Sequence, residues 1–341
     1  NLTGTNSIDA YEHYLKGMSL WHLRTAESLL QAIEAFEKAI NLDPGFAKAH
    51  AGLGLAWVVI DGYMPMDTTV TLEKAEAAAN KALSLDPENV EALAALAAIK
   101  AGNYMFDEAE ALFSKAIHLN PSFATAQQWY GNVLGWMGDP EAGLVALRKA
   151  QILDPRSRII SVNVAMTYRI MGMDQKAIDV LKEVREFAPD FPDGISQLMH
   201  AEMIVGNCEE VSKYGHELSG ILNKVSNSTP IYVDLCQDSD LAARAKAMGT
   251  MLDWPTLDIS DPNNPSLSYQ IQLIDVMVEL GEFEAALALL EKNMDFDGQF
   301  LFRQIRARKT ERGITFYCDQ RVQSLYEKYN IPPLENEAIC D

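Results

Sequence analysis

Five prolines recur at regular distances along the first 189 residues of the chain. Pro87, Pro121, Pro155 and Pro189 are each 34 residues apart, and Pro44 precedes them by 43, which is one period plus nine residues. Each proline follows an apolar stretch of similar sequence, such as EAFEKAINLDP and EALFSKAIHLNP. A fixed period of this length, made of two helical stretches, is typical of a helix-turn-helix solenoid. The period therefore predicts an all-α fold built from helical hairpins.

Residues 107–119, DEAEALFSKAIHL, show how one period specifies a helix. The apolar residues recur at helical spacing and form one face: Ala109, Leu112, Phe113, Ala116 and Ile117. Asp107 and Glu108 lead the stretch, as the helix dipole favours at an N-terminus. Pro121 ends the helix, because its ring disfavours helical geometry in the preceding residue.

Small residues mark the positions where the two helices of a hairpin approach closely. Gly54 and Gly131 lie in first helices and Ala75 and Ala109 in second helices, where large side chains would separate the pair. This pattern resembles the tetratricopeptide repeat (TPR) family, and one repeat carries it at Leu53-Gly54, Trp57, Ala75, Ala82 and Pro87. The resemblance covers residues 9–220 and implies a right-handed superhelix.

The repeats divide the chain into three predicted regions. Residues 1–224 hold a TPR array of six hairpins, the last of them degenerate. Residues 225–268 form an irregular helical and loop connection, rich in turn formers. Residues 269–341 hold a final TPR-like hairpin with C-terminal helices and a tail, the cap that a solenoid needs over its last apolar face. The nine extra residues of the second hairpin are either a binding loop or a surface loop packed by Tyr63 and Met64.

The charge of the chain excludes some partners. Its formal net charge is −20, with 48 acidic and 28 basic residues. Nucleic acids and anionic membranes are bound through clustered lysine and arginine, so neither is an expected partner. No apolar run approaches the roughly 20 residues of a membrane-spanning helix.

The four cysteines all lie in the last part of the chain, at Cys208, Cys236, Cys318 and Cys340. None belongs to a CxxC pair and no histidine stands at metal-ligand spacing, so a zinc site is not expected. Free thiols and disulfides both remain open, and four cysteines allow three pairings. Disulfides between Cys208 and Cys236, or between Cys318 and Cys340, would favour the periplasm.

Motifs of catalysis are absent from the sequence. It contains no HExxH, GxSxG, P-loop or EF-hand pattern, and its six histidines occupy unrelated repeat positions. GLGLAW has the wrong spacing for a nucleotide loop and lies inside a predicted helix. We therefore expect no enzyme activity, no cofactor and no metal.

A solenoid instead offers a concave surface, lined by the first helix of each repeat. The inner-face positions predict a groove for a protein or peptide ligand, in which aromatic, amide and guanidinium groups recognise an extended chain or a helix. The predicted groove residues are Tyr14, Met18, Trp21, Lys48, Gln128, Asn132, Trp136, Arg169 and His200. Asn132 matches the asparagine with which some TPR co-chaperones grip a terminal carboxylate, but the accompanying lysines are missing.

The N-terminal stretch resembles one bacterial group more closely than it resembles TPR proteins in general. AYEHYLKG, LWHLRT and LDPGFAKAHAGLG, within residues 8–60, are similar to signalling proteins in which a TPR region follows a winged-helix DNA-binding domain or a nucleotide cyclase domain. Many of these ToxR-like regulators are membrane-anchored, with a C-terminal periplasmic region. The resemblance implies a DNA-binding or cyclase domain upstream of Asn1 and a periplasmic location, with the cytoplasm as the alternative.

Two functions are consistent with these features. The first is the sensory or partner-binding half of a bacterial signalling or transcriptional regulator. The second is a stand-alone TPR scaffold that assembles other proteins. The two hypotheses differ in what precedes Asn1, which the residues themselves leave open.

Overall fold

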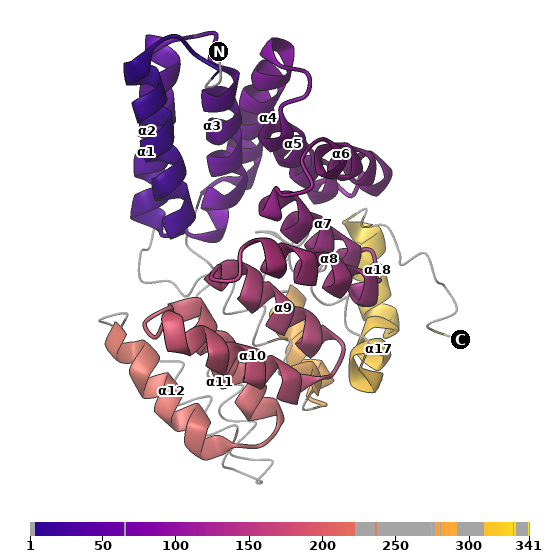
Figure 1. Cartoon of the computed structure of the whole chain (residues 1–341). Helices are drawn as coiled ribbons and strands as arrows, with labels where there is room; N and C mark the ends of the chain where they lie inside the picture. Colours follow the sequence, from indigo (N-terminus) through magenta and orange to yellow (C-terminus); the bar gives the residue numbers. More distant parts are fainter. Residues whose placement is uncertain are drawn as a thin grey trace. The chain divides into compact units, whose positions relative to one another are not determined.

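The computed structural model describes residues 4–64, 66–221, 236, 274, 277–279, 281–291, 310–329, 331 and 340. Within these residues the chain forms helices and no strand, in agreement with the predicted all-α fold (Figure 1). The helices of the array are α1 (Ile8–Leu23), α2 (Ala26–Leu42), α3 (Ala47–Val59), the short 3-10 helix η1 (Ile60–Gly62), α4 (Thr68–Leu85), α5 (Val90–Gly102), α6 (Phe106–Leu119), α7 (Ala124–Trp136), α8 (Pro140–Leu153), α9 (Arg158–Ile170), α10 (Asp174–Phe187), α11 (Pro192–Ile204) and α12 (Cys208–Ile221). Two further helices follow, α17 (Glu311–Tyr317) and α18 (Gln320–Lys328).

The helices pack as hairpins. α1 packs against α2, α3 against α4, α5 against α6, α9 against α10 and α11 against α12. Neighbouring hairpins join through the same kinds of contact, because α3 packs on α2 and α5, and α11 packs on α9 and α10. This repeated nearest-neighbour packing is the arrangement of a helical solenoid. These five hairpins confirm the all-α fold of helical hairpins predicted from the proline period.

The chain divides into two compact units. The first contains residues 1–133 and 259–266, and the second contains residues 134–258 and 267–341. The first unit holds α1 to α6 and most of α7, and the second holds α8 to α12 with α17 and α18. Of the predicted connection at 225–268, Cys236 alone is described, so that segment lies outside the described residues.

Each hairpin begins and ends for local reasons that the sequence makes plain. The Thr25 side chain accepts from the Ser28 amide, and the Ser28 hydroxyl accepts from the Thr25 amide, which forms a capping box at the start of α2. Asn89 caps α5 by accepting from the Ala92 amide at 3.0 Å. At the other end, α6 stops at Leu119, two residues before Pro121.

The core of the first unit is organised around Phe36, which is fully buried. A Cβ built on Gly17 would lie 2.6 Å from the Phe36 ring, and one built on Gly52 would lie 2.4 Å from it. Both distances are shorter than a carbon–carbon contact, so the ring occupies the space of two missing side chains. The glycines thereby allow α1, α2 and α3 to approach one another around a single aromatic ring.

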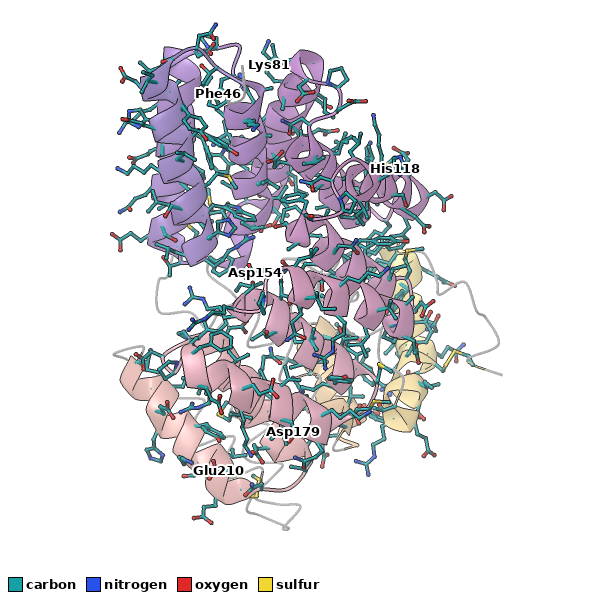
Figure 2. All side chains as sticks on the ribbon, viewed as in Figure 1. Phe46, Lys81, His118, Asp154, Asp179 and Glu210 are labelled. Carbon is teal, nitrogen blue, oxygen red and sulfur yellow. A yellow bond between two sulfur atoms is a disulfide. The ribbon has the colours of Figure 1, made fainter. Side chains whose placement is uncertain are left out.

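Side chains sort by polarity around this core (Figure 2). Phe46, labelled there, is fully buried and its ring lies 5.3 Å from that of Tyr14, edge to face. Lys81 and His118 of the first unit are exposed, and so is Asp179 of the second unit; all three are labelled. In the described part of the chain no helix is both long enough and apolar enough to cross a bilayer.

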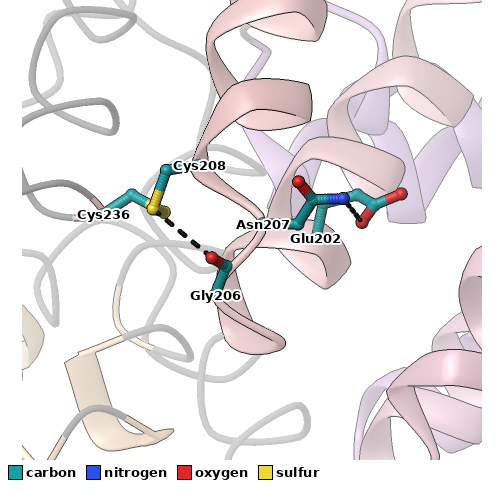
Figure 3. The surroundings of a disulfide bond; sticks show 5 residues. All are labelled: Glu202, Gly206, Asn207, Cys208 and Cys236. Carbon is teal, nitrogen blue, oxygen red and sulfur yellow. Dashed lines mark hydrogen bonds between the residues drawn. A yellow bond between two sulfur atoms is a disulfide. The ribbon is translucent and has the colours of Figure 1, made fainter.

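The cysteines form two disulfides, both within the second unit. Cys208, the first residue of α12, is bonded to Cys236, and Cys318, directly after α17, is bonded to Cys340. Figure 3 shows the first of them beside the turn between α11 and α12, where Asn207 donates to the Glu202 carboxylate at 3.0 Å. The bond fixes the N-terminus of α12 to a residue 28 positions further along the chain.

Candidate functional site

The predicted groove residues differ widely in exposure. Tyr14, Trp21, Gln128, Arg169 and His200 are buried, with at most 8% of each side chain exposed. Met18, Lys48, Asn132 and Trp136 are half-buried. Five of the nine predicted groove residues are therefore buried, and binding of a partner by this set stays a prediction. α11, which carries His200, is buried continuously from Gly194 to Met203, so it is covered on all sides over that stretch.

Tyr14 lies in an aromatic cluster of the first unit. Its ring is 6.1 Å from that of Phe36 and 6.2 Å from that of Tyr11, in addition to the edge contact with Phe46. Burial, followed by the charge of Glu91, raises the pKa of the Tyr14 phenol. Burial also raises the pKa of Glu91, against the opposing charge of Lys48. The structure thus brings Tyr14 and Lys48 close to the same carboxyl group on α5.

Trp21 lies at the end of α1 and is only 2% exposed. Its ring lies edge-on to Trp129 of α7, with 6.5 Å between the centroids. The guanidinium carbon of Arg24 lies 3.7 Å from the Trp21 ring centroid, a close cation–π contact. The indole nitrogen of Trp21 is buried and has no hydrogen-bond acceptor among the described residues.

Arg24 occupies the turn between α1 and α2 in an unusual conformation. Its backbone is left-handed, with φ 50° and ψ 52°, which costs a residue other than glycine roughly 1–2 kcal/mol. The side chain is only 7% exposed, and burial lowers its pKa to about 10, partly offset by Tyr63.

A polar network crosses the first helices of the second unit. Arg169, near the end of α9, donates to the Gln197 side-chain oxygen at 2.7 Å. Its Nε atom lies 3.7 Å from a carboxylate oxygen of Asp174, the first residue of α10. Gln197 in turn hydrogen-bonds to Asp193 one turn earlier on α11. These groups connect three helices through a buried guanidinium.

Burial controls the protonation of the acidic and basic groups around this network. It raises the pKa of Asp193 to about 6, although the hydrogen bond with Gln197 opposes the shift. It lowers the pKa of His200 well below the usual value, and the charge of Arg169 lowers it further. His200 is therefore neutral at physiological pH. The structure places it near Arg169, as the groove prediction implies, but at 0% exposure.

Glu202 forms the end of this polar region next to the disulfide. It is 2% exposed, forms an ion pair with Lys182 at 3.1 Å and accepts the hydrogen bond from Asn207. A buried carboxylate with such partners holds helices in register. Its partners come from α10 and from the turn before Cys208, so this cluster fits a structural role better than a catalytic one.

Several of these residues do not stand out in the sequence. Arg24 follows the last turn of α1, and nothing in LWHLRT shows that its backbone turns left-handed or that its side chain folds back onto Trp21. Gln197 and Asp193 are spaced i and i+4 on a helix, which is a recognisable hydrogen-bonding pair. That pair was detectable, whereas its link to Arg169 depends on how two hairpins stack.

The described residues hold no group of three or more metal-ligating side chains. No protein-family model matches the chain. The transcriptional regulator HilA of Salmonella paratyphi A is 26% identical over 266 residues, which covers 77% of this chain and 47% of HilA. HilA of Salmonella typhimurium has the same identity and coverage. The chain therefore spans about half the length of the curated relatives it matches.

Solved structures with the same fold have quite different sequences. A monomeric mutant of IFIT1 with m7Gppp-AAAA has a TM-score of 0.55 and 17% identity, and covers 84% of this chain and 70% of its own. The Cut9 and Hcn1 assembly of the APC/C has a TM-score of 0.51 and 15% identity, covering 67% and 46%. PilW, a type IV pilus biogenesis factor, has a TM-score of 0.50 and 19% identity, covering 62% and 96%. The chain has the tetratricopeptide-repeat fold, and its sequence is similar to that of a bacterial transcriptional regulator.

Proposed function

We propose that this chain is a protein-binding TPR module, and that it forms the interaction half of a bacterial transcriptional regulator. The observation that carries the proposal is the similarity to HilA, which extends over 77% of this chain and so includes most of the array. HilA is about twice as long as the matched region, which is consistent with a further domain in the regulator. The relatives by sequence are transcriptional regulators, and one neighbour by fold is a type IV pilus biogenesis factor.

The partner binds, in this proposal, where inner-face side chains keep some exposure. In the first unit these are Met18, Lys48 and Asn132. A thioether, an ammonium and an amide offer apolar contact, charge and hydrogen bonding, as peptide recognition needs. RNA is a poor candidate despite the capped RNA of the IFIT1 structure, because this chain carries a net charge of −20.

Site-specific photo-crosslinking in the native cell tests this function. A photoreactive amino acid at Met18 or Lys48 should capture the same protein band, because both positions lie on first helices of the first unit. The same amino acid at His118, which is exposed on the second helix α6, is the matched control and should capture nothing in common. Equal capture at all three positions, or none at Met18 and Lys48, would overturn the proposed inner-face binding.

An immunoblot of native cells separates the regulator from the stand-alone scaffold. Antiserum against this chain, which has a mass of 37.8 kDa, should detect a band larger by the mass of a DNA-binding domain. A band at the mass of the chain itself would favour the scaffold. The crosslinking result would still show that the inner face binds a partner in that case.

The two disulfides support a periplasmic location, because disulfides persist in oxidising compartments and are rare in the cytosol. Alkylation of the protein directly in native cells, followed by mass spectrometry, counts the thiols that react. Four cysteines that do not react, because they are paired in disulfides, would support the periplasm. Four reactive thiols would point to the cytoplasm, the alternative location.

A further inference from the structure

Two buried hydrogen-bond donors lie together at the end of α1. One is the guanidinium group of Arg24, whose residue is 7% exposed, and the other is the indole N–H of Trp21, whose residue is 2% exposed. The guanidinium carbon lies 3.7 Å from the indole ring centroid, so the two groups are in direct contact. The indole nitrogen is buried without a hydrogen-bond acceptor among the described residues, and the guanidinium stacks on the same indole ring.

The buried indole N–H of Trp21 is costly as long as it has no acceptor. Buried polar groups are nearly always hydrogen-bonded, and a buried cation is normally paired with a carboxylate. Arg24 is a buried cation, and burial lowers the pKa of its guanidinium to about 10. The cation–π contact occupies one face of the guanidinium and leaves its edge, where the N–H groups point, for hydrogen bonding.

We propose that Arg24 and the indole N–H of Trp21 form a binding site for the carboxylate group of a ligand. The guanidinium fork matches the planar geometry of a carboxylate. The single charge of a carboxylate also balances the single charge of Arg24. Phosphate, with roughly −1.5 to −2 charges, would leave excess negative charge in a buried site of an acidic protein.

The site differs from the lysine and asparagine clamp of TPR co-chaperones, because both donors come from one helix end instead of successive repeats. Its surroundings include two rings that lie edge-on to Trp21, the imidazole of His22 at 5.0 Å and the indole of Trp129 at 6.5 Å. Tyr63, from the loop inserted into the second hairpin, lies near enough for its charge to affect the pKa of Arg24. The insertion thereby acquires a place beside the ligand.

The inference rests on the proposed function for the source of the carboxylate, which is either a small organic acid or the end of a bound peptide. The binding itself is tested on the whole purified chain without any partner. The five tryptophans give five indole N–H signals in a two-dimensional nitrogen–proton spectrum, and Trp21→Phe assigns the signal of Trp21. Sodium acetate is the probe, with sodium chloride at equal ionic strength as the reference.

Acetate should move the Trp21 indole proton downfield in a saturable way, because the N–H gains an acceptor. Arg24→Gln should weaken the apparent affinity at least about tenfold, since it removes the paired charge. Lys74→Gln is the matched control: Lys74 also stacks on a tryptophan of the first unit, Trp57, at 4.2 Å, but it is exposed. This control should bind acetate as the parent does.

Arg24→Lys protects the test against a folding defect in Arg24→Gln, because it keeps the charge and loses the fork; it should give intermediate affinity. Tighter binding of triglycine than of its amide and of acetate would assign the carboxylate to a peptide end. Equal binding of acetate and triglycine would assign it to a small acid. An unmoved Trp21 signal, or an equal shift in sodium chloride, would overturn the site while leaving the partner capture by Met18 and Lys48 intact.

Discussion

At Gly52 the absence of a side chain is required by a neighbouring ring. A Cβ there would lie 2.4 Å from a Phe36 carbon, inside a core where the ring is fully buried and cannot turn away. Alanine at this position would stabilise the helix itself, because the helix propensity of alanine exceeds that of glycine by about 1 kcal/mol. Overpacking of a core costs about 1–3 kcal/mol, so the loss from overpacking should exceed the gain in helix propensity.

Gly52→Ala is therefore expected to lower the free energy of unfolding by about 1–2 kcal/mol. The matched control is Gly135→Ala in α7, where a Cβ would meet nothing within 4 Å. Since only the helix propensity changes there, the control should be neutral or slightly stabilising. Urea unfolding of both variants decides the matter, and equal effects would show that the Phe36 ring yields.

Asp193 links the polar network of the second unit to pH. Its pKa is about 6 in the folded chain and about 3.9 in an unfolded one, so folding favours the protonated form. The sign follows from linkage: this contribution to stability is present below about pH 4 and is lost as the pH rises through 6. Asp193 therefore costs stability at neutral pH.

Asp193→Asn should remove that dependence. The variant should be more stable than the parent above pH 6, by about 1–2 kcal/mol, and the difference should shrink towards pH 4. Urea unfolding of both proteins at several pH values between 4 and 8 measures it, and taking the difference cancels the other titrating groups. A difference that does not change with pH would mean that Asp193 titrates normally.

At the scale of the helix, the proline period predicted most of what the structure contains. It predicted the hairpins and the helix ends near each proline, because both depend on local sequence. It did not predict the burial of Arg169 and His200. An inner-face position shows which way a side chain leaves its helix, but what covers that face depends on segments distant in sequence.

Helix starts offer a second test at this scale. Asn89 caps α5 from a buried position, 3% exposed, whereas Asp67 caps α4 from an exposed one. Removing a cap costs about 1 kcal/mol where water can replace it, and more where the amide stays buried.

Asn89→Ala should therefore lower the free energy of unfolding by about 2 kcal/mol, and Asp67→Ala by about 1 kcal/mol. Urea unfolding compares the two variants under one set of conditions. The opposite order would mean that the Ala92 amide finds another partner when the Asn89 side chain is removed.

At the scale of the whole molecule, the cysteines are unevenly distributed. All four lie in the second unit, and both disulfides close loops within it, over 28 and 22 residues. Loops of this length contribute about 3 kcal/mol each when crosslinked. A reducing agent should therefore destabilise the second unit and leave the first unchanged.

Hydrogen exchange with mass spectrometry on the intact chain measures this difference. After reduction and blocking of the thiols, peptides from α9 to α12 should exchange faster by at least about tenfold, a change of 1.4 kcal/mol. Peptides from α1 to α6 should keep their rates. Faster exchange throughout would mean that the two units unfold as one.

The edge contact between Trp21 and Trp129 joins the first hairpin to the helix that opens the fourth. A solenoid in which each repeat contacts only its neighbours can extend elastically, and it can unfold from its end one repeat at a time. Within the first unit, the contact between the two indoles links two hairpins that are not neighbours in the sequence. A force that pulls on α1 must break the contact between Trp21 and Trp129 before the intervening hairpins can separate. The hairpins of this unit should therefore resist mechanical unfolding together.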